Sequence, residues 1–471
     1  MLVSQLFSGA DISGEIKNKE IKNITDNSQN CCEGSVFVCH NSGERYVEEA
    51  LRKGAVLVVA EKKLCENCIV TDDTAAEYAD LCAQFHGNRH KNLKLIAVTG
   101  TNGKTTTANM IYTILSLSGK KCGLIGTVKS NICGQERESR LSTPDPFEMH
   151  RMFSELYEWG AEYCIVEASS QGIFEGRLSG LSFSLGVMTN ISRDHLDYHG
   201  TMENYVAAKK SLFTLCEKAV INADDEYSKE FIAECKGKVI TYSSDKNDAD
   251  YIAKSIRLSQ EGSDYAVIAD YVIHRIKLSV PGEFNVMNSL AAVAAARQCN
   301  VSLEYCAYAL KNFSGVSGRM EILDIPAEYK VIIDYAHTPD ALKKVLLCLN
   351  SFPHGKIITV FGCGGERDRE KRSMMGDIAS QLSDVLVITS DNPRGEEPMK
   401  IIDDILSGIK KGKKTVYIHE NRRKAIEYAL KIASKNDIIL LAGKGHETYQ
   451  LIGEEMLPMN ERDIVREILG K

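Results

Sequence analysis

The sequence contains no apolar run long enough to form a membrane-spanning helix, and residues 1–30 lack the basic-then-apolar order of a secretory signal. It also lacks an excess of basic residues, because 57 Lys and Arg stand against 64 Asp and Glu, a formal net charge of −7. General nucleic-acid binding needs a basic surface, so we expect no nucleic-acid partner, although a few local basic residues can still bind small anions. Repeats and low-complexity segments are missing too. These absences predict a cytoplasmic globular protein that contacts neither membranes nor nucleic acids.

Cysteine is present without a disulfide framework. The fifteen cysteines are scattered, and an odd number cannot all pair within one chain, so we expect reduced thiols. Cys65 and Cys68 have the spacing of a redox or zinc motif, but no second ligand pair lies nearby in the sequence. We therefore interpret them as ordinary thiols.

A glycine-containing loop joins an apolar strand to a helix near residue 100. The loop reads Gly100-Thr101-Asn102-Gly103-Lys104-Thr105-Thr106 and follows an apolar run that begins at residue 95. Glycines let the backbone approach a phosphate, and the N–H groups at a helix start point toward it. Lys104 can then reach the terminal phosphates, and the Thr105 hydroxyl can hold a phosphate-bound magnesium ion. A glycine is usual where Val98 stands, so the motif is a shortened phosphate loop; an ordinary strand–turn–helix corner is the alternative.

The length of 471 residues and the α/β alternation predict three domains. We expect a small N-terminal α/β domain over residues 1–92, a central α/β domain with the phosphate loop over residues 93–316, and a C-terminal doubly wound, Rossmann-like domain over residues 317–471. The predicted strands after the loop are residues 122–126, 163–167, 184–189, 331–337, 357–362, 385–389 and 438–442, with earlier strands at 35–39 and 55–59. The predicted helices are residues 74–86, 108–117, 203–213 and 289–297, and residues 250–281 have the pattern of a β-meander.

Polar residues at strand ends form a second group of candidates. Glu167 ends one predicted strand, and His195 follows the next. Open α/β sheets bind ligands just beyond the carboxyl ends of their strands, so we expect both near metal-bound phosphates; a capping carboxylate and a structural histidine are the alternatives. Lys209 would occupy a solvated helix face if it had no other role. Asn285 and Asn288 precede the predicted helix 289–297, where they either cap it or bind a purine edge.

The order of these motifs resembles that of the Mur ligases, the ATP-dependent amide-forming enzymes of peptidoglycan synthesis. The resemblance covers nearly the whole chain. It rests on the phosphate loop, Glu167-Ala168-Ser169-Ser170, residues 189–200, Tyr205-Val206-Ala207-Ala208-Lys209, Gly282-Glu283-Phe284-Asn285, residues 334–340 and Asp391-Asn392-Pro393-Arg394. A single phosphate loop is weak evidence, whereas seven motifs in the family's order are specific.

The resemblance implies a reaction. The D-glutamate carboxylate of UDP-N-acetylmuramoyl-L-Ala-D-Glu would attack the γ-phosphate of ATP, and the amine of a diamino acid would then attack the acyl phosphate. Lys104 would hold the β- and γ-phosphates, while Thr105 and Glu167 would bind one Mg²⁺ and His195 a second. Lys209 matches the lysine that family members carbamoylate, a modification that converts a cation into a carboxylate-like metal ligand. The protein's main tasks would be positioning and charge neutralisation.

The resemblance also implies binding residues for the nucleotide and the sugar-peptide. The nucleotide set is the phosphate loop with Asn285 and Asn288 on the adenine side, and Arg319 and Asp334 brought in by domain closure. The sugar-peptide set is Ser28, Thr143, Ser169, Glu175 and Arg177. The chain departs from the family pattern where Gln29 replaces an arginine, Gln171 a frequent histidine and Ser317 a frequent proline. The change at Gln29 bears on affinity at the uridine end, and all three departures leave the implied catalytic set intact.

The third domain would choose the added amino acid. The implied contacts are Arg367, Asn392, Arg394, Gly443 and Glu447. An arginine can bind a distal carboxylate with two parallel hydrogen bonds, and Glu447 would meet the distal ammonium, so we predict meso-diaminopimelate as the acceptor. Without the family, residues 391–394 are only a proline-containing turn.

Several alternatives stay open at this stage. The same ligase could add L-lysine or meso-lanthionine, and the chain could be a related amide ligase such as a folylpolyglutamate synthetase, or a non-catalytic nucleotide-binding paralogue. The pair Asn392 and Arg394 speaks against a folate enzyme, and the presence of all implied catalytic residues speaks against a non-catalytic paralogue. Nothing in the sequence requires more than a monomer.

Overall fold

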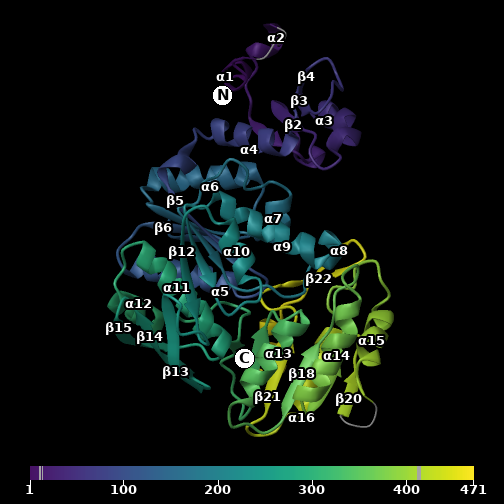
Figure 1. Ribbon diagram of the computed structural model, residues 1–471. Coiled ribbons are helices and arrows are strands. Elements are labelled where there is room, and N and C mark those ends of the chain that lie inside the picture. Colours follow the sequence, from purple (N-terminus) through teal and green to yellow (C-terminus); the bar gives the residue numbers. More distant parts are fainter. Residues whose placement is uncertain (10–11, 13, 140, 411–414, 471) are drawn as a thin grey trace.

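The computed structural model describes residues 1–9, 12, 14–139, 141–410 and 415–470. Its strands form three large sheets and one separate hairpin, and each large sheet is built from one continuous part of the chain (Figure 1). The predicted three-domain α/β architecture is therefore confirmed. The domain borders after residues 92 and 316 stay predictions; both fall between consecutive sheets.

The first domain is a parallel four-stranded sheet in the order β1-β2-β3-β4. Its core packs Val36 and Leu57 of the sheet against Tyr78 and Leu81 of α4, the helix that leads into the middle domain. Two strands of three residues each, β1 and β4, were not predicted, because such short segments carry little periodicity. The elements are α1 Val3–Leu6, α2 Gly14–Lys17, β1 Asn23–Thr25, η1 Ser28–Asn30, β2 Ser35–Val38, η2 Gly43–Tyr46, α3 Val47–Arg52, β3 Ala55–Ala60, β4 Cys68–Val70, α4 Thr74–Phe85 and η3 Arg89–Asn92.

The middle domain has an eleven-stranded sheet in the order β15-β14-β13-β12-β11-β10-β5-β9-β6-β7-β8. The strands from β12 to β6 are parallel, and β5 lies between β10 and β9. Their near-continuous apolar runs are typical of strands buried on both faces. The strands are β5 Lys94–Thr99, β6 Cys122–Ile125, β7 Lys129–Ile132, β8 Gln135–Glu138, β9 Tyr163–Glu167, β10 Leu185–Met188, β11 Lys218–Asn222, β12 Lys238–Ser243, β13 Tyr251–Ser259, β14 Gly262–Ala269 and β15 Val272–Leu278.

Helices cover both faces of this sheet. α5, α11 and α12 contribute to one hydrophobic core and α6, α9 and α10 to the other. The predicted meander is confirmed as the antiparallel strands β13, β14 and β15, which extend the parallel sheet beyond β12. The helices are α5 Lys104–Leu117, α6 Pro146–Trp159, α7 Ser170–Phe174, α8 Leu196–His199, α9 Met202–Ser211, η4 Leu212–Leu215, α10 Ser228–Glu234, α11 Glu283–Gln298 and α12 Leu303–Lys311.

One predicted helix boundary is wrong in a way that matters for the site. The sequence predicts a helix over residues 289–297, but α11 begins at Glu283, directly after Gly282 with its positive φ of 104°. Asn285 and Asn288 therefore lie inside the helix and are buried, so they do not cap its start. The alternative that they are N-caps is excluded.

The third domain is a doubly wound sheet in the order β16-β17-β21-β18-β19-β20, with only β16 antiparallel. Helices α13, α14 and α15 pack on one face and α16 and α17 on the other. The elements are β16 Glu321–Ile322, β17 Lys330–Asp334, α13 Pro339–Asn350, β18 Ile357–Phe361, α14 Glu370–Leu382, β19 Val385–Ile388, α15 Pro398–Ser407, β20 Thr415–Ile418, α16 Arg422–Ile432, β21 Ile438–Ala442, β22 Tyr449–Ile452, β23 Glu455–Pro458 and α17 Glu461–Ile468.

Two expectations about chemistry can be compared with the structure. All fifteen cysteines are free thiols, Cys65 and Cys68 included. Within the described ranges, no helix combines the length and the apolar character that crossing a bilayer would require.

Candidate active site

The predicted phosphate loop lies between the end of β5 and the start of α5, as the sequence indicates. Gly100 and Gly103 have positive φ angles of 144° and 84°, a conformation that glycine adopts readily. A Cβ atom at Gly100 would collide with the side chain of Thr189, and one at Gly103 with that of Asn288. The two glycines thus let the loop pack closely between the end of β10 and helix α11.

Two lysines converge on the loop. The Lys104 Nζ atom donates to the Gly100 and Thr101 carbonyl oxygens at 2.9 Å each, and the Lys209 Nζ atom donates to the Gly100 carbonyl at 2.8 Å. Lys209 is buried on α9, and its ammonium lies over the Tyr205 ring at 4.9 Å. Burial, together with the neighbouring charge of Lys104, holds the pKa of Lys209 well below its usual range.

Glu167 ends β9 beside β5 and is completely buried. Its carboxylate accepts hydrogen bonds from the Thr105 hydroxyl at 2.8 Å, the Thr127 N–H at 2.9 Å and the Thr127 hydroxyl at 2.8 Å. The structure thus brings two of the predicted magnesium ligands, Thr105 and Glu167, into direct contact. Thr127 also contacts this carboxylate, and no pattern in the sequence pointed to it.

His195 lies at the start of α8, with a positive φ of 53°. Its Nε2 atom is 3.3 Å from Asp194 Oδ2, and the same carboxylate oxygen is 3.8 Å from His337 Nε2 of the third domain. The surrounding protein lowers the pKa of His195 to about 4 by desolvation, although 49% of its side chain is exposed and Asp194 opposes the shift. Burial alone would raise the pKa of Asp194, but the two histidines hold it well below its usual range. Asp194 lies in the 189–200 motif and His337 in the 334–340 motif. Only their contact across the two domains makes them candidate residues of the active site.

Oxygen donors suited to magnesium are present but few. The predicted metal set supplies one carboxylate, from Glu167, and one imidazole, from His195. In the described part of the chain, no three His, Cys, Asp or Glu side chains are grouped closely enough to hold a metal ion. The contacting oxygen donors of Thr105 and Glu167 suit one magnesium ion, and His195, predicted for a second ion, lies beside Asp194; nucleotide phosphates, water or a modified lysine would supply the remaining ligands.

A cavity of about 690 Å³ lies between the middle and third domains. It is lined by ten of the predicted nucleotide residues: Thr101, Asn102, Gly103, Lys104, Thr105, Thr106, Asn285, Asn288, Arg319 and Asp334. Two of the predicted metal ligands, Glu167 and Lys209, are not among its lining residues, whereas His195 is. Asn285 and Asn288 face it from the first turns of α11, where the Asn288 amide donates to Asn285 Oδ1 at 3.3 Å.

The third domain reaches the phosphate loop directly. Arg319 donates to the Thr105 hydroxyl at 3.4 Å and stacks over the Tyr335 ring at 4.4 Å. Asn102 donates to Asp340 at 3.1 Å. Asp334 instead accepts the N–H groups of residues 320 and 336 at 2.7 and 2.8 Å, so its carboxylate shapes the backbone around Arg319. Burial raises the pKa of Asp334, and Arg319 opposes that rise.

Further ion pairs join the two domains, and the sequence did not predict them. Arg193, next to Asp194, binds Asp368 at 2.8 Å and Glu370 at 2.7 Å. Arg367, a predicted acceptor contact, binds Asp197 of α8 at 3.2 Å. Opposite charges on the two domains thus hold the third domain against the middle domain.

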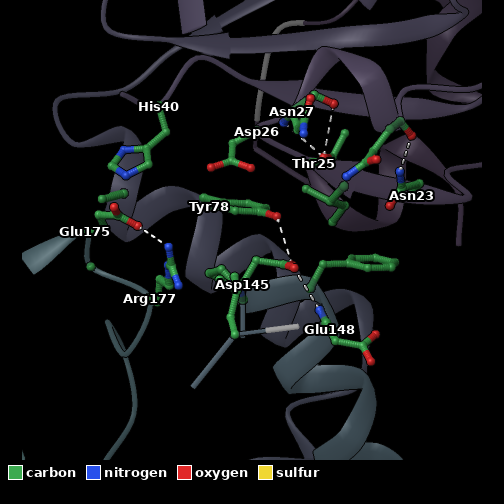
Figure 2. A pocket seen from close by; sticks show the side chains of 17 residues that line it. Asn23, Thr25, Asp26, Asn27, His40, Tyr78, Asp145, Glu148, Glu175 and Arg177 are labelled. Atoms are coloured by element: carbon green, nitrogen blue, oxygen red, sulfur yellow. Dashed lines mark hydrogen bonds and ion pairs between the residues drawn. The ribbon is translucent and has the colours of Figure 1, made fainter. Parts of the chain in front are cut away.

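A second cavity of about 480 Å³ lies between the first and middle domains (Figure 2). Asn27 lines it from the first domain, and Arg177 forms an ion pair with Glu175 at 2.5 Å on its other side. Arg177 lines both cavities, so they are neighbours. Ser28 is not among the lining residues, because its hydroxyl donates to Glu49 at 2.8 Å.

The buried Thr143 and the half-buried Ser169 form a pair beside these cavities. The Thr143 hydroxyl donates to the Glu167 carbonyl at 2.8 Å and lies 3.0 Å from the Ser169 hydroxyl, while the Arg177 guanidinium donates to the Thr143 carbonyl at 2.7 Å. Ser169 caps α7 by accepting from the Gly172 N–H at 3.0 Å and also lines the larger cavity. Thr143, with no exposed surface, positions its neighbours and does not itself line either cavity.

The predicted acceptor residues come from three loops at the carboxyl ends of the third sheet. Asn392 donates to Glu447 at 3.0 Å, and Gly443 packs so closely on Asp391 that a Cβ atom there would lie 2.8 Å from its carboxylate. Arg394 has a positive φ of 51° and donates to the Gly365 carbonyl at 2.8 Å. A strained backbone of this kind is often found at functional sites.

The fold and the site define a class of protein. The phosphate loop lies in a parallel sheet and faces a second, Rossmann-like α/β domain across a cavity. This is the arrangement of an ATP-dependent enzyme whose site is completed by domain closure. Residues 98–296 match the family model of the Mur ligase middle domain, and residues 318–445 that of the Mur ligase, glutamate ligase domain.

Similar proteins of known name indicate the same family over nearly the full length of the chain. The chain is 40% identical to UDP-N-acetylmuramoyl-L-alanyl-D-glutamate–2,6-diaminopimelate ligase 1 of Clostridium acetobutylicum, covering 97% of this chain and 96% of the relative. It is 39% identical to the Clostridium tetani 2,6-diaminopimelate ligase, covering 96% and 95%. A solved structure of a 2,6-diaminopimelate ligase matches with a TM-score of 0.70 and 32% identity, covering 100% and 99%. The chain belongs to the Mur ligase family and is an ATP-dependent ligase.

More distant structures share the fold alone. A folylpolyglutamate synthase of Mycobacterium tuberculosis, complexed with ADP and AMPPCP, matches with a TM-score of 0.67 at 16% identity, covering 84% of this chain and 95% of that one. The family resemblance inferred from the motifs is confirmed, and the alternative of a folate enzyme gains nothing beyond the shared fold.

Proposed function

We propose that this chain joins meso-diaminopimelate to the D-glutamate carboxylate of UDP-N-acetylmuramoyl-L-Ala-D-Glu, with ATP and Mg²⁺, in the synthesis of peptidoglycan precursors. The observation that carries the proposal is the meeting of Asn392, Arg394 and Glu447 at one end of the third sheet, in a chain 40% identical to a named 2,6-diaminopimelate ligase. The free cysteines agree with action in the cytoplasm, and we propose that the enzyme acts as a monomer.

The first step forms an acyl phosphate. The D-glutamate carboxylate oxygen bonds to the γ-phosphorus of ATP, and the bond from that phosphorus to the β–γ bridging oxygen breaks, releasing ADP. Lys104 would exchange the carbonyls of its own loop for the β- and γ-phosphate oxygens, and Arg319 would neutralise charge from the opposite wall. When bound, one magnesium ion would be held by Thr105 and Glu167 and a second by His195, with modified Lys209 as a further carboxylate-like ligand, and the ions would supply charge neutralisation on the phosphates.

Lys209 fits the role of a carbamoylated lysine. Its amine is buried and its pKa is lowered, so the neutral form can attack CO2: an N–C bond forms, a proton leaves and a carbamate anion results. A carbamate would add the second carboxylate-like donor that the predicted metal set otherwise lacks. It would also relieve the clustering of two cations around the Gly100 carbonyl.

The second step forms the amide. The acceptor amine attacks the acyl carbon, the bond to the phosphate oxygen breaks, and inorganic phosphate leaves. We assign the uridine end of the substrate to the cavity of Figure 2, which is supported by its continuity through Arg177 with the cavity that holds the phosphate loop. Glu175, Arg177 and Ser169 would bind the sugar-peptide between the two cavities, with Thr143 supporting Ser169.

The selectivity for meso-diaminopimelate would come from charges at the distal end of the acceptor. Arg394 and Arg367 would bind the distal carboxylate and Glu447 the distal ammonium. L-Lysine has no distal carboxylate, whereas meso-lanthionine has one, so meso-lanthionine is the harder competitor to reject. Arg367 now pairs with Asp197, and acceptor binding would have to draw it away from that carboxylate.

The proposal is tested by phosphate release from ATP, magnesium and UDP-N-acetylmuramoyl-L-Ala-D-Glu. Separate reactions contain meso-diaminopimelate, meso-lanthionine, L-lysine or no amino acid. We expect release with meso-diaminopimelate and little with the other additions. Release with L-lysine alone would keep the ligase and overturn the acceptor assignment. No release in any reaction, from a folded protein that binds ATP, would contradict the proposed substrates.

A further inference from the structure

A lysine beside the acceptor loops has no contact with solvent. Lys444 follows β21, and its side chain is 0% exposed, which is rare for lysine unless the charge is paired. Its Nζ atom donates to Asn392 Oδ1 at 2.8 Å and to Glu447 Oε2 at 2.6 Å, and it lies 5.3 Å from the centre of the Tyr449 ring. Both hydrogen-bond partners are acceptor contacts in the proposed function, whereas Lys444 itself has no role there.

The backbone around Lys444 directs its side chain inward. Gly443 and Gly445 on either side have positive φ angles of 108° and 54°. A Cβ atom at Gly443 would lie 2.8 Å from Asp391 Oδ2, and one at Gly445 would lie 2.7 Å from Tyr335 Cβ. The two glycines therefore let the loop pack against β17 and the 390–398 loop, and the lysine between them is enclosed by both.

The ammonium occupies one side of the Glu447 carboxylate and leaves the other side available. Oε2 accepts from Lys444 and, at 3.0 Å, from the Asn392 amide, whereas Oε1 accepts one longer bond of 3.3 Å from the Tyr335 hydroxyl. Asn392 Oδ1 also accepts from the Leu451 N–H at 3.0 Å, so this amide cannot rotate without losing two donors. The lysine thus holds both side chains in one arrangement, in which Glu447 Oε1 accepts only the long bond from Tyr335 among the hydrogen bonds of the described residues.

We propose that Lys444 is the positioning residue of the acceptor site: it fixes Asn392 and Glu447 so that Glu447 Oε1 receives the distal ammonium of a diamino acid. This inference rests on the proposed function. Lys444 is the cation that pairs with Glu447 in this network, so loss of the lysine removes the hydrogen bonds that hold Glu447 and Asn392 in one geometry. The site then loses selectivity for an ammonium-bearing acceptor, while the phosphate loop on the middle domain, which Lys444 does not contact, keeps its structure.

The test compares Lys444→Met with the unsubstituted enzyme in the phosphate-release assay. We expect the KM for meso-diaminopimelate to rise about tenfold or more, and the KM for ATP to stay within about twofold, because a charge-assisted hydrogen bond is lost at one site only. Lys435→Met is the matched control, since Lys435 is 67% exposed and pairs with the exposed Glu328 in the same domain. That control should leave both constants unchanged.

A double substitution separates positioning from general stability. If Lys444 acts through Glu447, Lys444→Met should add less than about threefold to the acceptor KM of Glu447→Gln, although each alone has a large effect. Losses that multiply, or a Lys444→Met enzyme with normal acceptor KM, would overturn the inference. If Lys444→Met does not melt cooperatively, Lys444→Gln takes its place with the same criteria. If the unsubstituted enzyme releases no phosphate with any acceptor, the proposed function is overturned. If Lys444→Met turns over meso-diaminopimelate normally, this inference alone is overturned.

Discussion

Replacement of Arg372 by Met tests whether a buried guanidinium holds the acceptor loops in place. Arg372 lies on α14 with a 1% exposed side chain. Its guanidinium donates to the two oxygens of Glu396 at 2.9 and 3.0 Å, to Asp404 at 2.9 Å and to the Gly364 carbonyl at 3.2 Å. These bonds connect the loop before α14 with the loop that carries Arg394. Their removal should destabilise the third domain by about 2–3 kcal/mol at neutral pH.

The charge part of this effect has a defined pH window. Hydrogen bonding to Arg372, against a smaller opposing effect of burial, lowers the pKa of Glu396 from 4.5 to about 2. A carboxyl group with a lowered native pKa stabilises the fold above the unfolded pKa, and this stabilisation is lost as the pH falls from about 4.5 toward 2. This pKa difference between the folded and unfolded states corresponds to about 3 kcal/mol of unfolding free energy in full. Solvent screening of the partly exposed pair reduces it to about 1–2 kcal/mol.

The assay is urea unfolding followed by far-ultraviolet circular dichroism at pH 7, 5, 4 and about 3. The free energy lost in Arg372→Met should shrink by about 1 kcal/mol or more between pH 7 and pH 3, because Glu396 becomes protonated in the unfolded chain over that range while its folded-state pKa of about 2 keeps the ion pair charged. Arg369→Met is the matched control: Arg369 is 73% exposed and lies 3.4 Å from the same Glu396, so its loss should cost under about 0.5 kcal/mol. A loss that is the same at every pH would refute the argument and assign the effect of Arg372 to packing.

Three further substitutions test the cavity and its closure. Arg193→Gln removes the ion pairs to the third domain and should raise the KM for ATP about three- to tenfold with little change in melting temperature. If the KM and the radius of gyration both stay unchanged, these pairs do not hold the domains together. Gly103→Ala forces a Cβ atom into the Asn288 side chain at a positive φ, so calorimetry should find ATP affinity reduced at least about tenfold, and wild-type affinity would contradict the close packing of the loop. Arg394→Ala should cost about 10–100-fold in kcat/KM for meso-diaminopimelate and much less for L-lysine, and equal losses for both would exclude a contact with the distal carboxylate.

Local patterns in the sequence predicted the family, the three α/β domains and the phosphate loop. Strands such as β5 and β9 are buried on both faces, so each appears as an apolar run, and the loop after β5 needs glycine for its backbone conformation. These features depend on neighbouring residues only. The boundary of α11 was wrong because its first turn, Glu283 to Val286, carries no clear start signal and its N-cap, Gly282, makes no side-chain cap.

Tertiary structure alone decided which charges meet. Arg193 and Arg372 pair with carboxylates that are distant in sequence, and Asp194 contacts His337 of another domain. Lys444 is enclosed together with Glu447, from which a tight turn separates it. A lysine or an arginine in a polar loop has the same local pattern whether it is solvated or buried. Whether the charged side chain is buried depends on how whole domains pack. That packing decides whether the charge lies in a binding site or in water.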